Sequence, residues 1–138
     1  MEKNSSDTIV NFSNVTKQYG DLIVLDNLNL EIKKNEMISI IGPSGSGKTT
    51  VLRVLMTLEK IDGGVIHFDG APLTHMASNG SIIEADEKHL RQRRSKIGMV
   101  FQQFNVWPHL NALENVVRAQ LVVAKRSRKK AEDKATKM

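Results

Sequence analysis

The residues with the most specific chemistry in this sequence form a glycine-rich loop at residues 42–49. The loop reads G-P-S-G-S-G-K-T, so a glycine is followed five residues later by Gly-Lys-Thr. Glycines let the backbone bend around phosphate oxygens, the lysine supplies a charge for the β- and γ-phosphates, and the threonine hydroxyl suits Mg²⁺. By chance the four constrained positions match about once in 200 chains of this length. We therefore predict that residues 42–49, called the phosphate loop below, bind a nucleoside triphosphate.

The segments on either side of the phosphate loop have the patterns that such a loop needs. Residues 37–41 are apolar without alternation, which predicts a strand buried on both faces, as in a parallel sheet. Residues 48–59 carry Val51, Leu55 and Leu58 at helical spacing, which predicts a helix. A strand that ends at a glycine-rich turn and opens a helix presents backbone N–H groups to an anion.

Shorter patterns predict the remaining elements. Asn111 and Glu114 resemble a capping box before a helix. Asp69 with Gly70 is typical of a hairpin turn, which we favour over a metal-binding acid at a strand end. Residues 82–86 are too short and too polar for a buried strand, and residues 73–85 are expected to form a surface excursion. The further expected strands lie at residues 8–15, 28–32, 65–68 and 97–101, and the further expected helices at residues 86–94 and 116–124.

Composition narrows the class of protein. The 138 residues suit one domain, and the absence of cysteine excludes disulfides and thiolate metal sites. There is no signal-peptide pattern and no apolar run of 18 residues, so we expect a cytosolic protein. The net charge is +5, and the basic run at residues 125–130 has no interleaved aromatic residues. We interpret that run as a solvated helix face and expect no nucleic acid partner.

Two further side chains could act beside the phosphate loop. Tyr19 precedes Gly20 in a turn; it is either an ordinary half-buried aromatic or a ring that stacks on a base, which contributes about 1–3 kcal/mol. Gln102 follows the expected strand at residues 97–101, at the edge where α/β sheets bind ligands. From its position alone, Gln102 is either a ligand-binding residue at this edge or an ordinary loop residue.

Together these motifs resemble the ATP-binding subunit of ABC transporters, over residues 9–124. Tyr19 matches the aromatic position that stacks on adenine, and the phosphate loop with Thr50 matches the Walker A motif. Residues 64–70 match the antiparallel hairpin, and residues 97–104 match the Q-loop with Gln102 as its glutamine. The segment at residues 105–116 is similar to the one that faces the membrane subunits in this family.

The resemblance implies an α/β P-loop NTPase fold, with an antiparallel β subdomain beside part of a RecA-like core. It implies that ATP and Mg²⁺ bind, that Lys48 and Gln102 are catalytic, and that Thr49 and Gln102 approach the metal. Val24 is expected beside the base and ribose. The expected nucleotide-binding residues are Tyr19, Val24, Gly42, Ser44, Gly45, Ser46, Gly47, Lys48, Thr49 and Thr50.

The sequences of these motifs are most similar to those of importers of polar amino acids and ectoine-like solutes. This implies membrane permease subunits, a second nucleotide-binding subunit and, indirectly, a solute-binding protein as partners, with the chain on the inner face of the plasma membrane. The family's signature motif, Walker B acids, D-loop and switch histidine are missing, so we interpret residues 1–138 as the N-terminal part of one nucleotide-binding domain. We expect it to bind ATP and barely hydrolyse it. The alternatives are a non-transport ABC ATPase, an inactive nucleotide-binding fragment, or another P-loop enzyme such as a kinase or GTPase.

Overall fold

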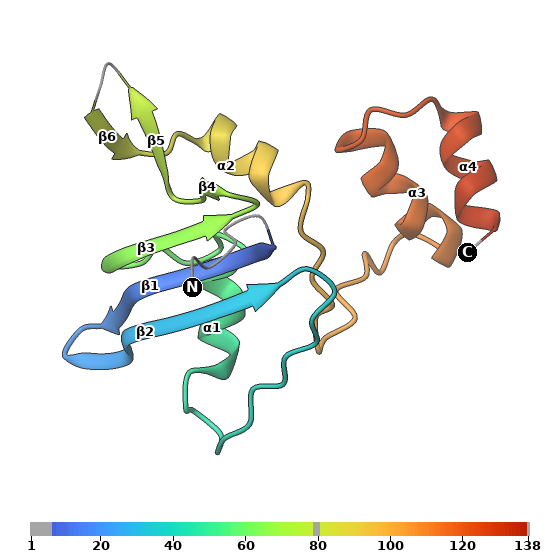
Figure 1. The fold of residues 1–138 in the computed structure, drawn as a ribbon. Helices are drawn as coiled ribbons and strands as arrows, with labels where there is room; N and C mark the ends of the chain where they lie inside the picture. The colour runs from blue at the N-terminus through green and yellow to red at the C-terminus, as the bar shows by residue number, and fades with distance from the viewer. Residues whose placement is uncertain (1–6, 79–80, 138) are drawn as a thin grey trace. The chain divides into compact units, whose positions relative to one another are not determined.

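The computed structural model describes residues 7–78 and 81–137, which form two compact units (Figure 1). The first unit ends at Met99 and the second begins at Val100. The first contains the strands and helices β1 (Thr8–Tyr19), β2 (Leu22–Lys33), α1 (Lys48–Leu55), β3 (Gly63–Phe68), β4 (Ala71–Pro72), β5 (His75–Ser78), β6 (Ser81–Glu84) and α2 (Glu87–Arg94). The second contains α3 (Ala112–Val122) and α4 (Arg128–Thr136).

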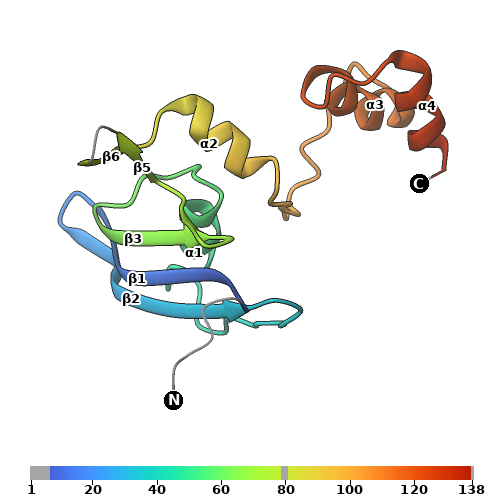
Figure 2. The same ribbon diagram turned by 45° about the horizontal axis from the view of Figure 1, so that its top comes forward.

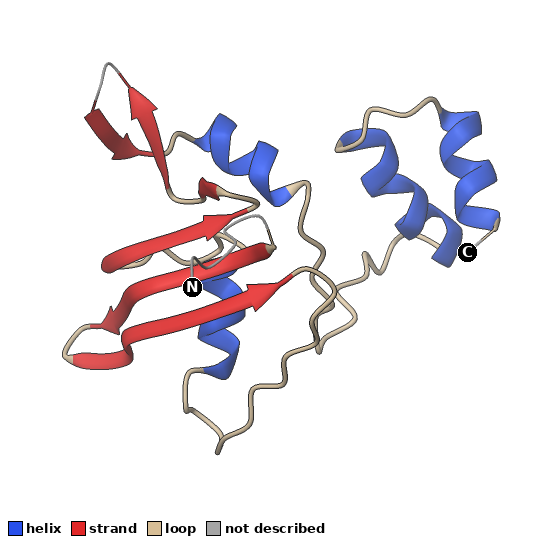
Figure 3. Ribbon diagram, viewed as in Figure 1, coloured by secondary structure: helices blue, strands red, loops and turns tan. Residues whose placement is uncertain are grey.

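The first unit is built on an antiparallel sheet with the strand order β2-β1-β3-β4 (Figure 3). The strands expected at residues 8–15, 28–32 and 65–68 are confirmed, and β1 and β2 are longer than the sequence indicated. β1 and β2 form a hairpin whose turn contains Gly20, at a φ of 59°. Because both strands run on to this turn, Tyr19 lies at the tip of the hairpin and pairs with Leu22.

One face of the sheet packs against α1, which lies behind the strands in both views (Figures 1 and 2). Apolar residues alternate along the strands, so their buried side chains share this face. Each large apolar side chain that is buried in this way contributes roughly 1.5–3 kcal/mol. The buried cluster consists of Val10, Phe12, Val15, Leu25, Val51, Val54, Ile66, Phe68 and Leu73. This core fixes the start of α1, and therefore the phosphate loop, against β2.

Two predictions of buried strands are wrong. Residues 37–41 form no strand, and Met37 and Ile41 are each 92% exposed. Residues 97–101 also form no strand, and Val100 is 98% exposed. A parallel strand is stable only between neighbours that pair with its backbone. Within residues 7–78 and 81–137, no strand pairs with either segment, although Ile97 packs against the buried cluster.

The helix after the phosphate loop is shorter than the predicted residues 48–59. α1 ends at Leu55, and Thr57 has a φ of 51°, which lies outside the helical region. Val51 and Val54 are its buried residues, whereas Leu58 is exposed. The predicted helix is therefore correct for its first two turns. The chain then leaves the helix and continues to β3.

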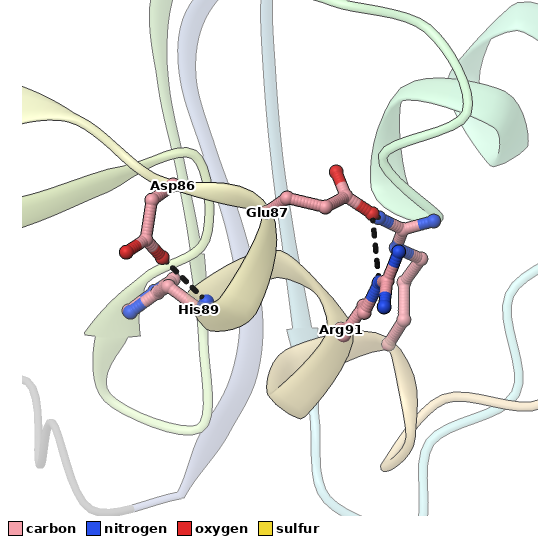
Figure 4. A network of polar contacts seen from close by, with 5 residues as sticks. Asp86, Glu87, His89 and Arg91 are labelled. Carbon is pink, nitrogen blue, oxygen red and sulfur yellow. Dashed lines mark hydrogen bonds and ion pairs between the residues drawn. The ribbon is translucent and has the colours of Figure 1, made fainter. Parts of the chain in front are cut away.

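The predicted hairpin turn at Asp69 and Gly70 is confirmed. Asp69 and Gly70 both have positive φ, as a type I′ hairpin turn requires, so Asp69 joins β3 to β4. The excursion at residues 73–85 contains the β5–β6 hairpin, whose residues 79–80 lie outside the described part of the chain. Asp86 caps α2 by accepting a hydrogen bond from the backbone N–H of His89 at 2.7 Å (Figure 4).

The second unit is a pair of helices. In α3, Asn111 accepts a hydrogen bond from the N–H of Glu114, and the Glu114 carboxylate accepts one from the N–H of Asn111, which confirms the predicted capping box. The basic run leads into α4, where Ala131 is fully buried and Val117 of α3 is also buried. No helix in residues 7–78 and 81–137 is long and apolar enough to cross a membrane.

Candidate nucleotide site

The phosphate loop is shaped by glycines that adopt left-handed conformations. Gly45 has a φ of 81° and Gly47 a φ of 85°, a region that other residues rarely adopt. Gly47 is the N-cap of α1 and supplies no capping side chain. The first helical hydrogen bond of α1 runs from the N–H of Val51 to the carbonyl of Gly47, so the N–H groups of the first turn have no acceptor within the helix. This helix terminus, with no acid in its first turn, favours an anion.

The side chain of Lys48 folds back onto the phosphate loop. Its Nζ donates hydrogen bonds to the carbonyl of Gly42 at 2.8 Å, to the carbonyl of Pro43 at 2.5 Å and to Oγ of Ser46 at 3.4 Å. The backbone of the loop therefore curves around its own ammonium group. A lysine ammonium and the free N–H groups of a helix N-terminus on the same loop are the groups that bind a polyphosphate.

Val24 of β2 forms the wall beside the loop. A Cβ added to Gly47 would lie 3.0 Å from both Cγ1 and the carbonyl oxygen of Val24 and 3.4 Å from Cδ2 of Leu25. Leu25 pairs with Lys17 across the hairpin, and Tyr19 follows two residues later on β1. The fold thus brings Val24 and the phosphate loop together and places Tyr19 on the neighbouring strand. The Tyr19 residue is 44% exposed, which leaves ring surface open to a ligand.

The other expected site residues lie as follows. Ser44 and Thr49 are exposed, and Thr50 is half-buried in the first turn of α1. The hydroxyl of Thr49 offers the oxygen ligand that Mg²⁺ prefers. In residues 7–78 and 81–137 no group of three or more His, Cys, Asp or Glu side chains could hold a metal ion. Gln102 is exposed in the second unit, and its role stays a prediction.

Sequence reasoning missed two residues beside Tyr19. Lys17 is 8% exposed, with Nζ 3.3 Å from Oδ2 of Asp62 and 5.0 Å from the centroid of the Tyr19 ring. The backbone N–H of Gln18 donates to the same Oδ2 at 2.8 Å. This hydrogen bond, and then the Lys17 ammonium, hold the pKa of Asp62 below its usual value. The signal in the sequence was the spacing of Lys17 and Tyr19, which places both on one face of a strand.

A separate hollow of about 590 Å³ lies between the α1–β3 connection, the β5–β6 hairpin and α2. Lys60 and Glu84 form an ion pair at its lining, with 2.5 Å between Nζ and Oε1. None of residues 42–49 lines this hollow. It is therefore distinct from the candidate nucleotide site.

Comparison with known proteins identifies the family. The family model described as "ABC transporter" matches residues 25–138, which include the whole phosphate loop. The chain belongs to the ABC transporter family. The match also confirms the P-loop NTPase fold that the sequence indicated.

Two relatives within the ABC transporter family are amino-acid transport proteins by name. The chain is 49% identical over 133 residues to a probable amino-acid ABC transporter ATP-binding protein of Sinorhizobium fredii, covering 96% of this chain and 52% of that protein. It is 41% identical to the glutamine transport ATP-binding protein GlnQ of Bacillus subtilis, covering 92% of this chain and 48% of that protein. The chain thus spans about half the length of the curated relatives it matches.

Among solved structures, the chain resembles the ATP-binding cassette MJ0796 in a dimeric, post-hydrolysis state bound to ADP and Pi. The TM-score is 0.74 at 37% identity, and the match covers 94% of this chain and 55% of that one. A similarity of this size supports the family assignment at the level of the fold.

Proposed function

We propose that this chain is the nucleotide-binding part of an ABC importer subunit that couples ATP hydrolysis to uptake of a polar amino acid or a compatible solute. The observation that carries the proposal is the geometry of the phosphate loop, in which the Lys48 ammonium lies against the carbonyls of Gly42 and Pro43 and Gly47 opens the N-terminus of α1. The names of the relatives favour an amino-acid importer over a non-transport ABC ATPase.

Each residue of the site has a distinct role in this proposal. The N–H groups of the first turn of α1 bind the phosphates, and Lys48 neutralises the charge on the β- and γ-phosphates. Tyr19 stacks on adenine, and Val24 lies against the base and ribose. Mg²⁺, when bound, draws off phosphate charge, and Thr49 with Gln102 would hold it. Gln102 would also orient the attacking water and report the nucleotide state to a partner subunit.

The proposed partners follow from the same family. Membrane permease subunits would bring the chain to the inner face of the plasma membrane, where a separate solute-binding protein acts indirectly. A second nucleotide-binding subunit is supported by the dimeric state of the MJ0796 cassette. Co-purification with a candidate permease, lost when residues 105–116 are replaced, would test the transport role.

We expect the chain alone to hydrolyse ATP at a negligible rate. Hydrolysis needs one acid that positions water and another that helps to hold the metal. The sequence contains no L-S-G-G-Q segment, and its single Asp-Glu dipeptide is Asp86-Glu87. Both residues of that pair instead stabilise α2. Asp86 is its N-cap, and Glu87 forms ion pairs with Arg91 and Arg94 (Figure 4). A phosphate-release assay checks this; robust turnover that is lost in Lys48→Ala would contradict it.

A further inference from the structure

A charged side chain is buried directly behind the ring expected to stack on adenine. Among the residues that the structure describes, Lys17 is the only charged residue that is buried. Burying an ammonium group is costly unless it is paired. Here the partners are the Asp62 carboxylate, at 3.3 Å, and the Tyr19 ring, at 5.0 Å from Nζ to the centroid. The second distance is within the range of a cation–π interaction.

The backbone fixes both partners of Lys17. Asp62 directly precedes β3, and its N–H donates to the carbonyl of Thr16 at 2.8 Å. Its Oδ2 accepts a hydrogen bond from the N–H of Gln18 and pairs with Nζ of Lys17, so the backbone and the carboxylate of Asp62 together contact the residues on either side of Lys17 in β1. The pairing of β1 with β2 shifts register before and after Lys17. Such irregularities re-aim side chains near functional sites.

A solely structural ion pair accounts for Lys17 and Asp62 but not for the position of Tyr19. The Tyr19 residue is 44% exposed, so the Lys17 ammonium covers one part of the ring while another part meets solvent. A cation against one face draws π-electron density toward itself. The opposite face then repels the electron-rich face of a stacked base less strongly. A ring that is already held also loses less conformational entropy when a base binds.

We propose that Lys17, anchored by Asp62, is a positioning residue that holds the Tyr19 ring for adenine and strengthens the stacking. This inference rests on the proposed nucleotide site. Lys17 touches neither the phosphates nor the reacting atoms in this account, and it acts only through Tyr19. Its contribution is therefore specific to the base of the nucleotide.

The test compares two probes, ATP and inorganic triphosphate, each competing with a fluorescent ATP analogue. We expect Lys17→Met to weaken ATP binding about fivefold to tenfold and to leave triphosphate binding unchanged. Lys17→Arg keeps the cation and should bind ATP within about twofold of wild type. Lys88→Met, which removes an exposed lysine of α2, is the matched control and should change neither affinity.

The NMR spectrum of Tyr19 gives a second readout that separates this role from a structural one. Tyr19 is the single tyrosine of the chain, so its ring proton resonances report stacking directly. We expect ATP to shift them in wild type and to shift them less in Lys17→Met, or in Asp62→Asn if Lys17→Met does not fold. Equal loss of ATP and triphosphate binding, or no loss of either, would overturn the inference.

The outcome also distinguishes the inference from the proposed function. If Tyr19→Ala lowers ATP affinity and Lys17→Met does not, the nucleotide site stands and the role of Lys17 is wrong. If wild type binds neither ATP nor triphosphate, the proposed function fails, and the role of Lys17 fails with it.

Discussion

Replacing Lys48 by alanine is expected to weaken ATP binding at least a hundredfold, that is, by about 2.7 kcal/mol or more. The Lys48 ammonium is the charge that meets the β- and γ-phosphates, and each charge-assisted hydrogen bond contributes about 1.5–3 kcal/mol. The same group holds the carbonyls of Gly42 and Pro43. Its removal therefore loses both the phosphate contact and the curvature of the loop.

Isothermal titration with ATP measures this loss. Lys88→Ala is the matched control, because it makes the same change of net charge at an exposed position on α2. Lys48→Arg should recover part of the affinity, since it keeps the charge but replaces a point ammonium by a planar fork. Equal affinities for Lys48→Ala and Lys88→Ala would show that the phosphate loop does not bind the nucleotide.

Replacing Gly64 by alanine is expected to lower the free energy of unfolding by about 3 kcal/mol or more. Gly64 lies in β3 at a φ of 78°, and a Cβ there would be 2.3 Å from the carbonyl oxygen of Asn14 and 2.5 Å from that of Ser13. Backbone atoms of the central strand cannot give way without breaking the β1–β3 pairing. Ile66 and Phe68, the buried residues of β3, would lose their place in the core.

Gly70→Ala separates the two causes of this effect. Gly70 has a similar φ of 74°, but an added Cβ would meet nothing within 4 Å. It should therefore cost only the conformational strain, about 1–2 kcal/mol. Urea unfolding followed by circular dichroism measures both variants. If they lose the same stability, the contact between Gly64 and Asn14 has no energetic consequence, and the packing of β3 on β1 described here is wrong.

The sequence was sufficient wherever a short segment carries its own reason to fold. The glycines of the phosphate loop, the Asp69–Gly70 turn and the Asn111–Glu114 capping box each depend on residues a few positions apart. Their outcomes could be read from local conformational preference and side-chain hydrogen bonding. Val51 on α1 was predicted for the same reason, because helical spacing alone places it on the face that meets the sheet.

The sequence was insufficient wherever folding depends on distant partners. Residues 37–41 have the pattern of a buried strand, yet no strand in the described part of the chain pairs with them. An apolar pattern indicates which side chains a segment can bury. It does not indicate whether a neighbouring strand is present to pair with the segment. Lys17 was missed because its burial depends on Asp62, which is 45 residues away in the sequence and reaches β1 only through the pairing of β3.

A titration of ¹⁵N-labelled chain with Mg-ATP, followed by NMR, shows whether residues 42–49 hold the triphosphate of ATP. We expect saturable shifts of the amide resonances of Gly45, Gly47 and Lys48, with the ring resonances of Tyr19 shifting over the same range of ATP concentration. Inorganic triphosphate should shift the loop amides alone. Saturable binding that leaves these loop amides unmoved, or no saturable binding of ATP, would contradict the claim.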